Sequence, residues 1–212
     1  MKYSAKKASM KPCRIWGTFK LDATPTKGET IDAGTYFTDG KVIIHTDYVR
    51  LPVDVQALLD AGVTMMYQNG VAKPDMFTPD YASILADAGH PDHLNIHNTG
   101  VLTEGADTLL SLFDGKDCDK PGIFSFNRDM VNWLPDESVL DLRVAPLSDY
   151  SPGANRGGPM FVWEYANSRR DGDARFIACI MPVVIREGDK PLELIERVFA
   201  SAYPKMFAGS NK

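Results

Sequence analysis

The stretch that says most about the fold is residues 35–49, which read TYFTDGKVIIHTDYV. β-Branched and aromatic residues flank Asp39-Gly40, and an Asp-Gly pair between two such runs is the strongest short-range signal for a tight hairpin. The sequence therefore predicts an antiparallel hairpin that joins strands at Thr35 to Phe37 and Lys41 to Val49. Upstream, a short apolar and aromatic run predicts a further strand at Ile15 to Leu21.

Beyond Val49, helix signals and strand signals alternate. Proline at a first helical position, capping hydroxyls and terminating glycines predict three helices. These helices are expected at Val53 to Asp60, Thr78 to Gly89 and Thr103 to Phe113. Short apolar runs predict strands at Val63 to Tyr67, Leu94 to Val101 and Ile123 to Phe126. This alternation predicts a central βαβα stretch with at least one parallel strand pair.

The last third of the chain returns to strand patterns. Strands are expected at Val139 to Val144, Met160 to Tyr165 and Arg175 to Ile185, the last two paired antiparallel across a polar turn. Pro182 indicates that the final strand is an edge strand or carries a bulge. Leu192, Ile195 and Phe199 keep a helical spacing, which predicts a closing amphipathic helix.

The elements together predict an α+β fold: a mixed sheet with antiparallel N- and C-terminal strands around the βαβα stretch. An α/β fold is the alternative. We expect one globular domain at residues 15–212, because no linker marks a domain boundary. The basic segment at residues 1–14 lacks an apolar core and predicts a flexible N-terminal arm.

Composition limits the class of protein. The chain has 212 residues and a net charge of −5, which disfavours a nucleic-acid binder. No apolar run approaches the roughly 18 residues that a membrane span requires. The three cysteines, Cys13, Cys118 and Cys179, are odd in number and far apart, as is typical of a reducing compartment. We therefore expect a soluble cytoplasmic protein without membrane association.

Three of the four histidines lie between residues 90 and 97. Histidine is the commonest metal ligand, so His90, Asp92 and His93 form a candidate site for a divalent metal ion, the one cofactor that the sequence suggests. Their spacing matches no established zinc pattern. The alternative is a hydrogen-bonded loop cluster that holds no metal.

A second hypothesis is catalytic. His97 and Thr99 fall on one face of the expected strand, as in phosphoesterases that use two histidines to grip a phosphate and to transfer protons. His45 is the candidate for the second histidine, but its neighbouring hydroxyl, on Thr46, falls on the opposite strand face. The match to this pattern is therefore half complete.

Arginines gather in one segment of this acidic chain. A planar guanidinium recognises phosphate and carboxylate, so an anion-binding surface is predicted from Arg156, Arg169, Arg170 and Arg175. The competing interpretation is a solvated turn in which Asp149, Asp171 and Asp173 pair with these cations. The sequence favours a binding protein that recognises a protein partner or a small anionic ligand. The alternative is a phosphoesterase or metal-dependent hydrolase.

Overall fold

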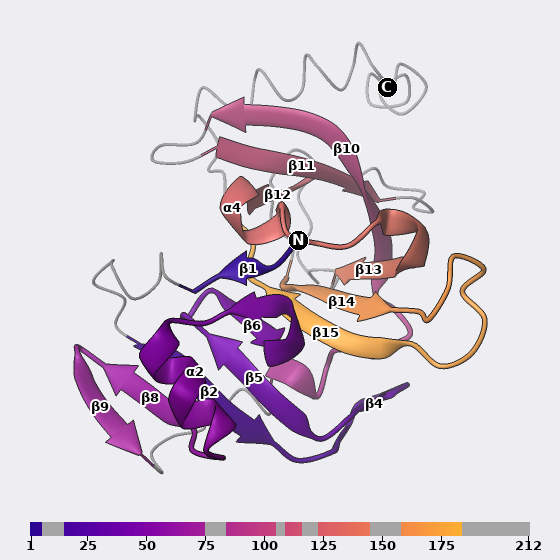
Figure 1. The fold of residues 1–212 in the computed structure, drawn as a ribbon. Helices are drawn as coiled ribbons and strands as arrows, with labels where there is room; N and C mark the ends of the chain where they lie inside the picture. Colours follow the sequence, from indigo (N-terminus) through magenta and orange to yellow (C-terminus); the bar gives the residue numbers. More distant parts are fainter. Residues whose placement is uncertain (6–14, 75–83, 105–108, 116–122, 145–157, 184–212) are drawn as a thin grey trace, which may run out of the picture.

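A computed structural model (Figure 1) describes residues 1–5, 15–74, 84–104, 109–115, 123–144 and 158–183. Several sequence predictions concern residues outside these ranges. They are the closing helix with Phe199, the position of Arg156, the sites of Cys13 and Cys118, and residues 78–83 of the helix expected from Thr78. In the described part of that segment only Ile84 and Leu85 are helical and residues 86–89 form a turn, so the helix does not extend to Gly89.

The described residues form a mainly β structure. Eleven strands follow one another in a single hydrogen-bonded order. The order is β12 (Ile123–Asn127), β11 (Leu109–Gly115), β10 (Leu94–Glu104), β13 (Leu140–Val144), β14 (Met160–Glu164), β15 (Arg175–Ile180), β6 (Val42–His45), β5 (Gly34–Thr38), β2 (Ile15–Leu21), β8 (Met65–Gln68) and β9 (Val71–Pro74). Every neighbouring pair in this order is antiparallel.

The hairpin predicted at Asp39-Gly40 is confirmed. β5 pairs antiparallel with β6, and Tyr36 lies opposite His45. Gly40 has a φ of +81°, which glycine adopts at no steric cost. The carboxylate of Asp39 accepts the backbone N–H groups of Lys41 and Val42. The turn is therefore fixed by its own two residues, as the local sequence predicts.

The helices are few and short. α2 (Val53–Asp60) has the predicted bounds. Pro52 is its N-cap residue, and Gly62, with a φ of +78°, follows its C-terminal end. α4 (Arg128–Val131) and two 3₁₀ turns, η1 (Thr46–Tyr48) and η2 (Glu137–Val139), complete the named helical elements. None of the helices in the described ranges has the length and apolar content needed to cross a bilayer.

The prediction of a helix from Thr103 to Phe113 is wrong. β10 continues to Glu104, β11 begins at Leu109, and five residues of β11 pair with β12. Leucine favours helices in isolation, but cross-strand pairing overrides so weak a preference. The described residues thus contain no βαβα stretch, and the strands beginning near residues 41, 63, 94 and 123 form no parallel pair.

The one parallel pair in the described ranges lies at the N-terminus. β1 (Tyr3–Ser4) pairs with β7 (Val49–Arg50), and the side chain of Tyr3 is buried against Phe37 and Trp133. The segment expected to be a flexible arm therefore begins with a strand. A separate short ladder joins β3 (Thr24–Pro25) to β4 (Thr30–Ile31).

The antiparallel pairing predicted between β14 and β15 is confirmed, with a register shift that leaves Ile177 unpaired. β15 is not an edge strand, because β14 and β6 flank it. The strand ends at Ile180, so Pro182 falls beyond it and removes no ladder hydrogen bond.

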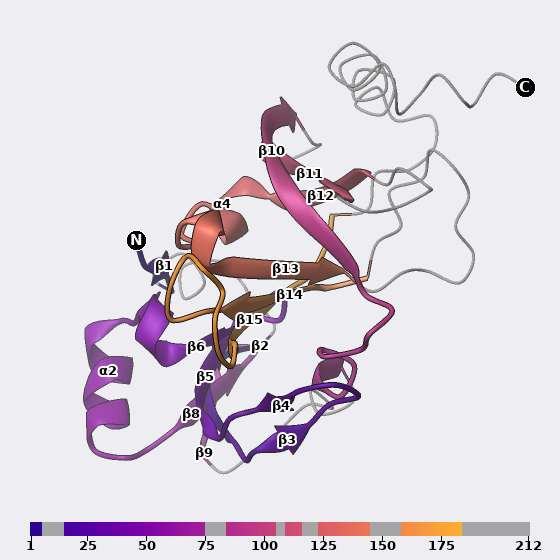
Figure 2. The same cartoon turned by 90° about the vertical axis from the view of Figure 1, so that its right-hand side faces the viewer.

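Both faces of the sheet are buried. Leu140, Leu142 and Val162 belong to a first core cluster, which also contains Val55 of α2. The alternate residues Phe161 and Trp163 belong to a second cluster, together with Ile31 of β4. Figure 2 shows α2 and the β3–β4 ladder on opposite sides of the sheet. Central strands such as β14 therefore place apolar residues on both of their faces, unlike strands of a sheet with one solvated face.

Candidate functional site

The candidate site lies where β6 meets β15. Antiparallel pairing of Ala178 with Ile44 brings the start of β15 beside the end of β6, and the cross-strand pair Glu164–Arg175 adds the end of β14. The 3₁₀ turn η1 follows β6 directly. We call the resulting group the Arg175 cluster; its members are His45, Asp47, Tyr48, Glu164 and Arg175.

Arg175 is the centre of this cluster. Its Nη2 atom donates to Asp47 Oδ2 at 3.0 Å and to His45 Nε2 at 2.8 Å. A guanidinium can only donate, so the imidazole is the acceptor in this contact; its Nδ1, 3.2 Å from Nη2, also accepts the backbone N–H of Asp47. Burial, and then the charge of Arg175, lower the pKa of His45, although Asp47 acts in the opposite direction. The imidazole is therefore neutral at pH 7.

The surroundings hold His45 tightly. The Tyr36 ring meets the imidazole edge-on, with centroids 5.2 Å apart. A Cβ on Gly34 would lie 3.0 Å from His45 Nε2, so this glycine allows the backbone of β5 to approach the ring.

The two tyrosines of this region are both held in the neutral form. Burial raises the pKa of Tyr36 to about 12. Tyr48 donates its hydroxyl to Glu164, and burial together with this hydrogen bond raises the pKa of Tyr48.

The arginines predicted to bind an anion occupy different settings. Arg169 and Arg170 lie exposed in the β14–β15 turn, where Arg170 has a φ of +55° and donates to the carbonyl of Glu137. The Arg169 side chain makes no hydrogen bond or ion pair with any described residue. Asp171 and Asp173 form no ion pair with these arginines either, so the self-pairing considered from the sequence is not found within the described part of the turn.

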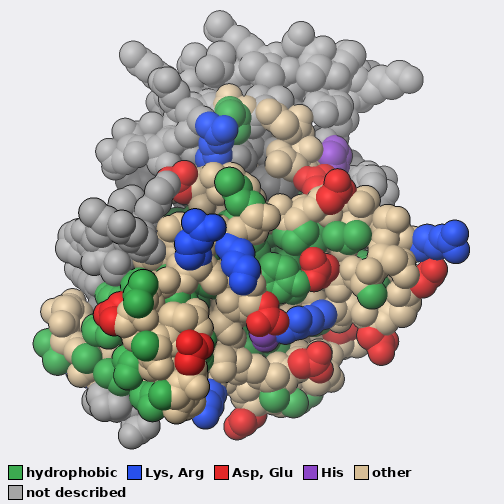
Figure 3. Space-filling model, in the orientation of Figure 1, with side chains coloured by type: hydrophobic (Ala, Val, Ile, Leu, Met, Phe, Trp, Pro, Cys, Tyr) green, Lys and Arg blue, Asp and Glu red, His purple; other side chains and the backbone are tan. Residues whose placement is uncertain are grey.

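Figure 3 shows the face of the molecule seen in Figure 1. Basic and acidic side chains are interspersed across its centre, and hydrophobic side chains gather at the lower left over α2, β8 and β9. Val53 and Val71 are among the exposed apolar residues of those elements, with 87% and 60% of their surface accessible. Charge on this face is therefore mixed rather than uniformly positive.

The two histidines of the phosphoesterase hypothesis do not meet. His45 is on β6 and His97 is on β10, and β13, β14 and β15 lie between them in the ladder. Thr99 shares β10 with His97 and is equally distant from His45 in the strand order. Instead, the structure joins His45 to Arg175, which the sequence suggested for a different role.

His90 and His93 face different partners. His93 Nε2 lies 3.2 Å from Asp87 Oδ2, whereas His90 Nδ1 lies 3.7 Å from Asp92 and accepts its backbone N–H. The two imidazole rings stack with centroids 5.7 Å apart. Across the described ranges, no three or more histidine, cysteine, aspartate or glutamate side chains form a group suited to a metal ion.

His93 is almost fully buried, with 1% of its side chain exposed. Its ring lies parallel to that of Phe161, with centroids 5.2 Å apart. Burial lowers the pKa of His93 more than its hydrogen bond to the Asp87 carboxylate raises it. Its Nδ1 atom has no hydrogen-bond partner among the described residues. His93 is thus a neutral imidazole fixed by one carboxylate.

Sequence reasoning missed an ion network around Arg143. This guanidinium binds both oxygens of Glu29, at 2.9 and 3.1 Å, and Oδ2 of Asp141 at 2.6 Å. It also lies over the buried Trp163 ring, 5.7 Å from the centroid. Glu29 and Arg143 are 114 residues apart in the sequence, so no local sequence pattern predicts their pairing. We call these four residues the Arg143 network.

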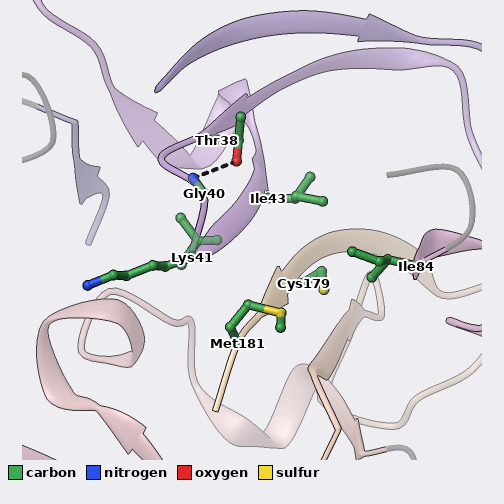
Figure 4. A pocket seen from close by; sticks show the side chains of 8 residues that line it. Thr38, Gly40, Lys41, Ile43, Ile84, Cys179 and Met181 are labelled. Carbon is green, nitrogen blue, oxygen red and sulfur yellow. Dashed lines mark hydrogen bonds between the residues drawn. The ribbon is translucent and has the colours of Figure 1, made fainter. Parts of the chain in front are cut away.

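Cys179 is unsuited to nucleophilic chemistry. It lines a pocket of about 30 Å³ together with Ile43, Ile84 and Met181 (Figure 4), a space comparable to that occupied by one water molecule. Burial raises the pKa of the Cys179 thiol to about 12. Because the thiolate is the reactive form, this cysteine is a core residue rather than a reactive one.

Comparison with protein-family models, with curated proteins and with solved structures gives no match for this chain.

Proposed function

We propose that this chain is an intracellular binding protein that recognises an anionic group on a protein partner or small ligand. The observation that carries the proposal is that the side chain of Arg175 is exposed and yet held in a fixed orientation. Its side chain is 43% exposed, yet Asp47 and His45 hold its Nη2 atom in place. An exposed guanidinium with a fixed orientation loses less freedom on binding than a free side chain does.

The donors that remain on Arg175 suit a carboxylate or phosphate. A guanidinium carries five N–H groups, and the hydrogen bonds to described residues all involve Nη2. Nε and Nη1 are left for a ligand. Asp47 offsets much of the positive charge, so recognition depends on the direction of these donors more than on long-range attraction. Arg169 in the neighbouring turn supplies a second exposed cation.

The test is a titration of the full chain with phosphate, pyrophosphate, citrate and nucleotides, followed by thermal denaturation. A ligand specific for the folded state raises the melting temperature. We expect Arg175→Ala to abolish the shift and Arg175→Lys to lose most of it, because lysine keeps the charge without the planar fork.

Lys20→Ala is the matched control, since it removes one positive charge from an exposed position on β2. The Arg175 variants should stay folded, because an exposed ion pair contributes at most about 1 kcal/mol to stability. If every anion leaves the parent unshifted, or if Arg175→Ala responds like Lys20→Ala, the proposal is wrong.

The alternative function is a hydrolase, and one observation favours it: Asp87 orients the imidazole of His93. An imidazole held by a carboxylate is part of many general-base sites. However, His93 makes no hydrogen bond with a serine, threonine or cysteine in the described part of the chain. Aryl phosphate monoesters and diesters, with and without divalent metal ions, test this alternative. Hydrolysis that His93→Gln abolishes would support it.

A further inference from the structure

A second candidate site lies over the second core cluster, to which Phe161 belongs. It is a hollow of about 400 Å³, within the range of roughly 300 to 1,000 Å³ typical of small-ligand pockets. Three segments form it: the loop between β3 and β4, the turn at residues 84–89, and the start of β14. The lining residues are Lys27, Ile84, Ala86, Asp87, Pro159 and Phe161.

The hollow carries one positive and one negative group side by side. Lys27 Nζ lies 3.3 Å from Asp87 Oδ1, and the two side chains are 62% and 40% exposed. Burial raises the pKa of Asp87, but hydrogen bonds from His93 and Lys27 outweigh it and lower the pKa below its usual value. Asp87 is therefore a carboxylate at pH 7, and the lining residues other than Lys27 and Asp87 are apolar.

Hydrogen bonds fix the side chain of Asp87 and the loop that contains Lys27. The second oxygen of Asp87 is fixed by buried His93, which stacks on Phe161. Lys27 lies in a tight loop closed by a hydrogen bond of 2.8 Å from the Thr26 amide to the Glu29 carbonyl. Glu29 is in turn bound by both nitrogens of Arg143. The carboxylate of Asp87 and the backbone that carries Lys27 are thus held in place by contacts within the protein.

We propose that this hollow binds a free amino acid with an apolar side chain. The ligand ammonium would pair with Asp87, its carboxylate with Lys27, and its side chain would cover Ile84, Pro159 and Phe161. Lys27 and Asp87 are already paired with each other, and a zwitterion can add its ammonium to the carboxylate and its carboxylate to the ammonium, so that four charges alternate. A ligand with one charge can pair with only one end of the Lys27–Asp87 ion pair. The site shares no residue with the Arg175 cluster and is independent of the function proposed there.

Isothermal titration calorimetry of the full chain tests the proposal. The ligands are L-phenylalanine, L-leucine and L-methionine, with two one-charge analogues: L-phenylalaninamide, which lacks the carboxylate, and N-acetyl-L-phenylalanine, which lacks the ammonium. We expect at least one free amino acid to bind, and each analogue of phenylalanine to bind about tenfold more weakly than phenylalanine, the usual effect of one unsatisfied charged group.

The variants separate the two charges. Asp87→Asn should weaken amino-acid binding about tenfold, and Lys27→Ala should do the same without affecting the core, because its side chain is exposed. Asp22→Asn and Lys20→Ala are matched controls at exposed positions and should bind like the parent. The proposal is overturned if no amino acid binds at millimolar concentration, if the analogues bind equally well, or if Lys27→Ala binds like the parent.

Discussion

At the scale of single residues, Gly28 and Gly89 control how two loops meet. A Cβ on Gly28 would lie 2.3 Å from the carbonyl oxygen of Gly89, a contact with rigid backbone. We therefore expect Gly28→Ala to cost about 2 kcal/mol, as overpacking does elsewhere. The control is Gly100→Ala, where no atom lies within 4 Å but φ is +73°, so only about 1 kcal/mol of backbone strain is expected. Urea denaturation measures the free energy of unfolding of both variants. Equal losses in Gly28→Ala and Gly100→Ala would contradict the prediction.

His93 should make stability depend on pH. Its pKa in the folded protein lies below the ordinary value of 6.5, so the unfolded chain binds more protons as the pH falls past 6.5. Stability is therefore complete above that value and declines toward the folded pKa, by at most about 1.4 kcal/mol per pH unit for one group. His45 adds a decline of the same sign.

We expect His93→Gln to reduce this decline between pH 7.5 and 5.5, whatever its effect on stability at neutral pH. Urea unfolding at three pH values measures the slope directly. The lowered pKa of Asp87 contributes only at lower pH, because carboxylates titrate near 4. A parent whose stability is constant over the interval, or a variant with the parent's slope, would show that His93 is not held neutral.

Candidate residues were predicted unevenly for a physical reason. Residue type alone indicates that arginine and histidine can bind anions or move protons, and this singled out His45 and Arg175. Their contact depends on strand order, because the two residues are 130 positions apart in sequence. Lys27, Asp87 and Arg143 carry no motif, and only the folded chain places them near their partners.

At the scale of elements, the Arg143 network fixes the β3–β4 ladder to the sheet. Arg143 belongs to β13, whereas Glu29 lies in the loop between β3 and β4. Arg143→Ala should cost about 3 kcal/mol, because two partly buried carboxylates lose their counter-charge. The triple variant Arg143→Met, Glu29→Gln and Asp141→Asn removes those charges together and should recover most of the loss. Thermal unfolding distinguishes the two, and equal melting temperatures would contradict the electrostatic account.

The elements that the sequence predicts well are those with local signals. The Asp39-Gly40 turn and the start and end of α2 are encoded within a few residues, and both appear with nearly the expected bounds. β11 is different, because its leucines are compatible with a helix until β10 and β12 supply partners on both sides. The prediction of a parallel strand pair depended on alternating helices and strands, and it is wrong because the helix expected at Thr103 to Phe113 is not formed.

At the scale of the whole molecule, both core clusters should unfold together. Trp133 belongs to the first cluster and Trp163 to the second, and residues of the same strands contribute to both. We expect a single urea transition that coincides by tryptophan fluorescence and far-ultraviolet circular dichroism, the pattern of one cooperative domain. Phe176→Ala and Trp133→Phe should each shift the whole transition. Separate transitions for the two probes would indicate two independent units.

The position of β15 beside β6 also bears on how the chain folds during synthesis. Every strand from β1 to β9 precedes residue 75, and every strand from β10 onward follows residue 93, so the β6–β15 ladder joins an early half to a late one. Until residues 175–180 leave the ribosome, β6 has one unpaired edge, and its apolar sequence is open to association with other chains. Closing so long a loop is slow compared with forming local hairpins. The Arg175 cluster therefore becomes complete only when residues 175–180 are available to pair with β6. The hollow also needs the later half of the chain, because Pro159 and Phe161 line it.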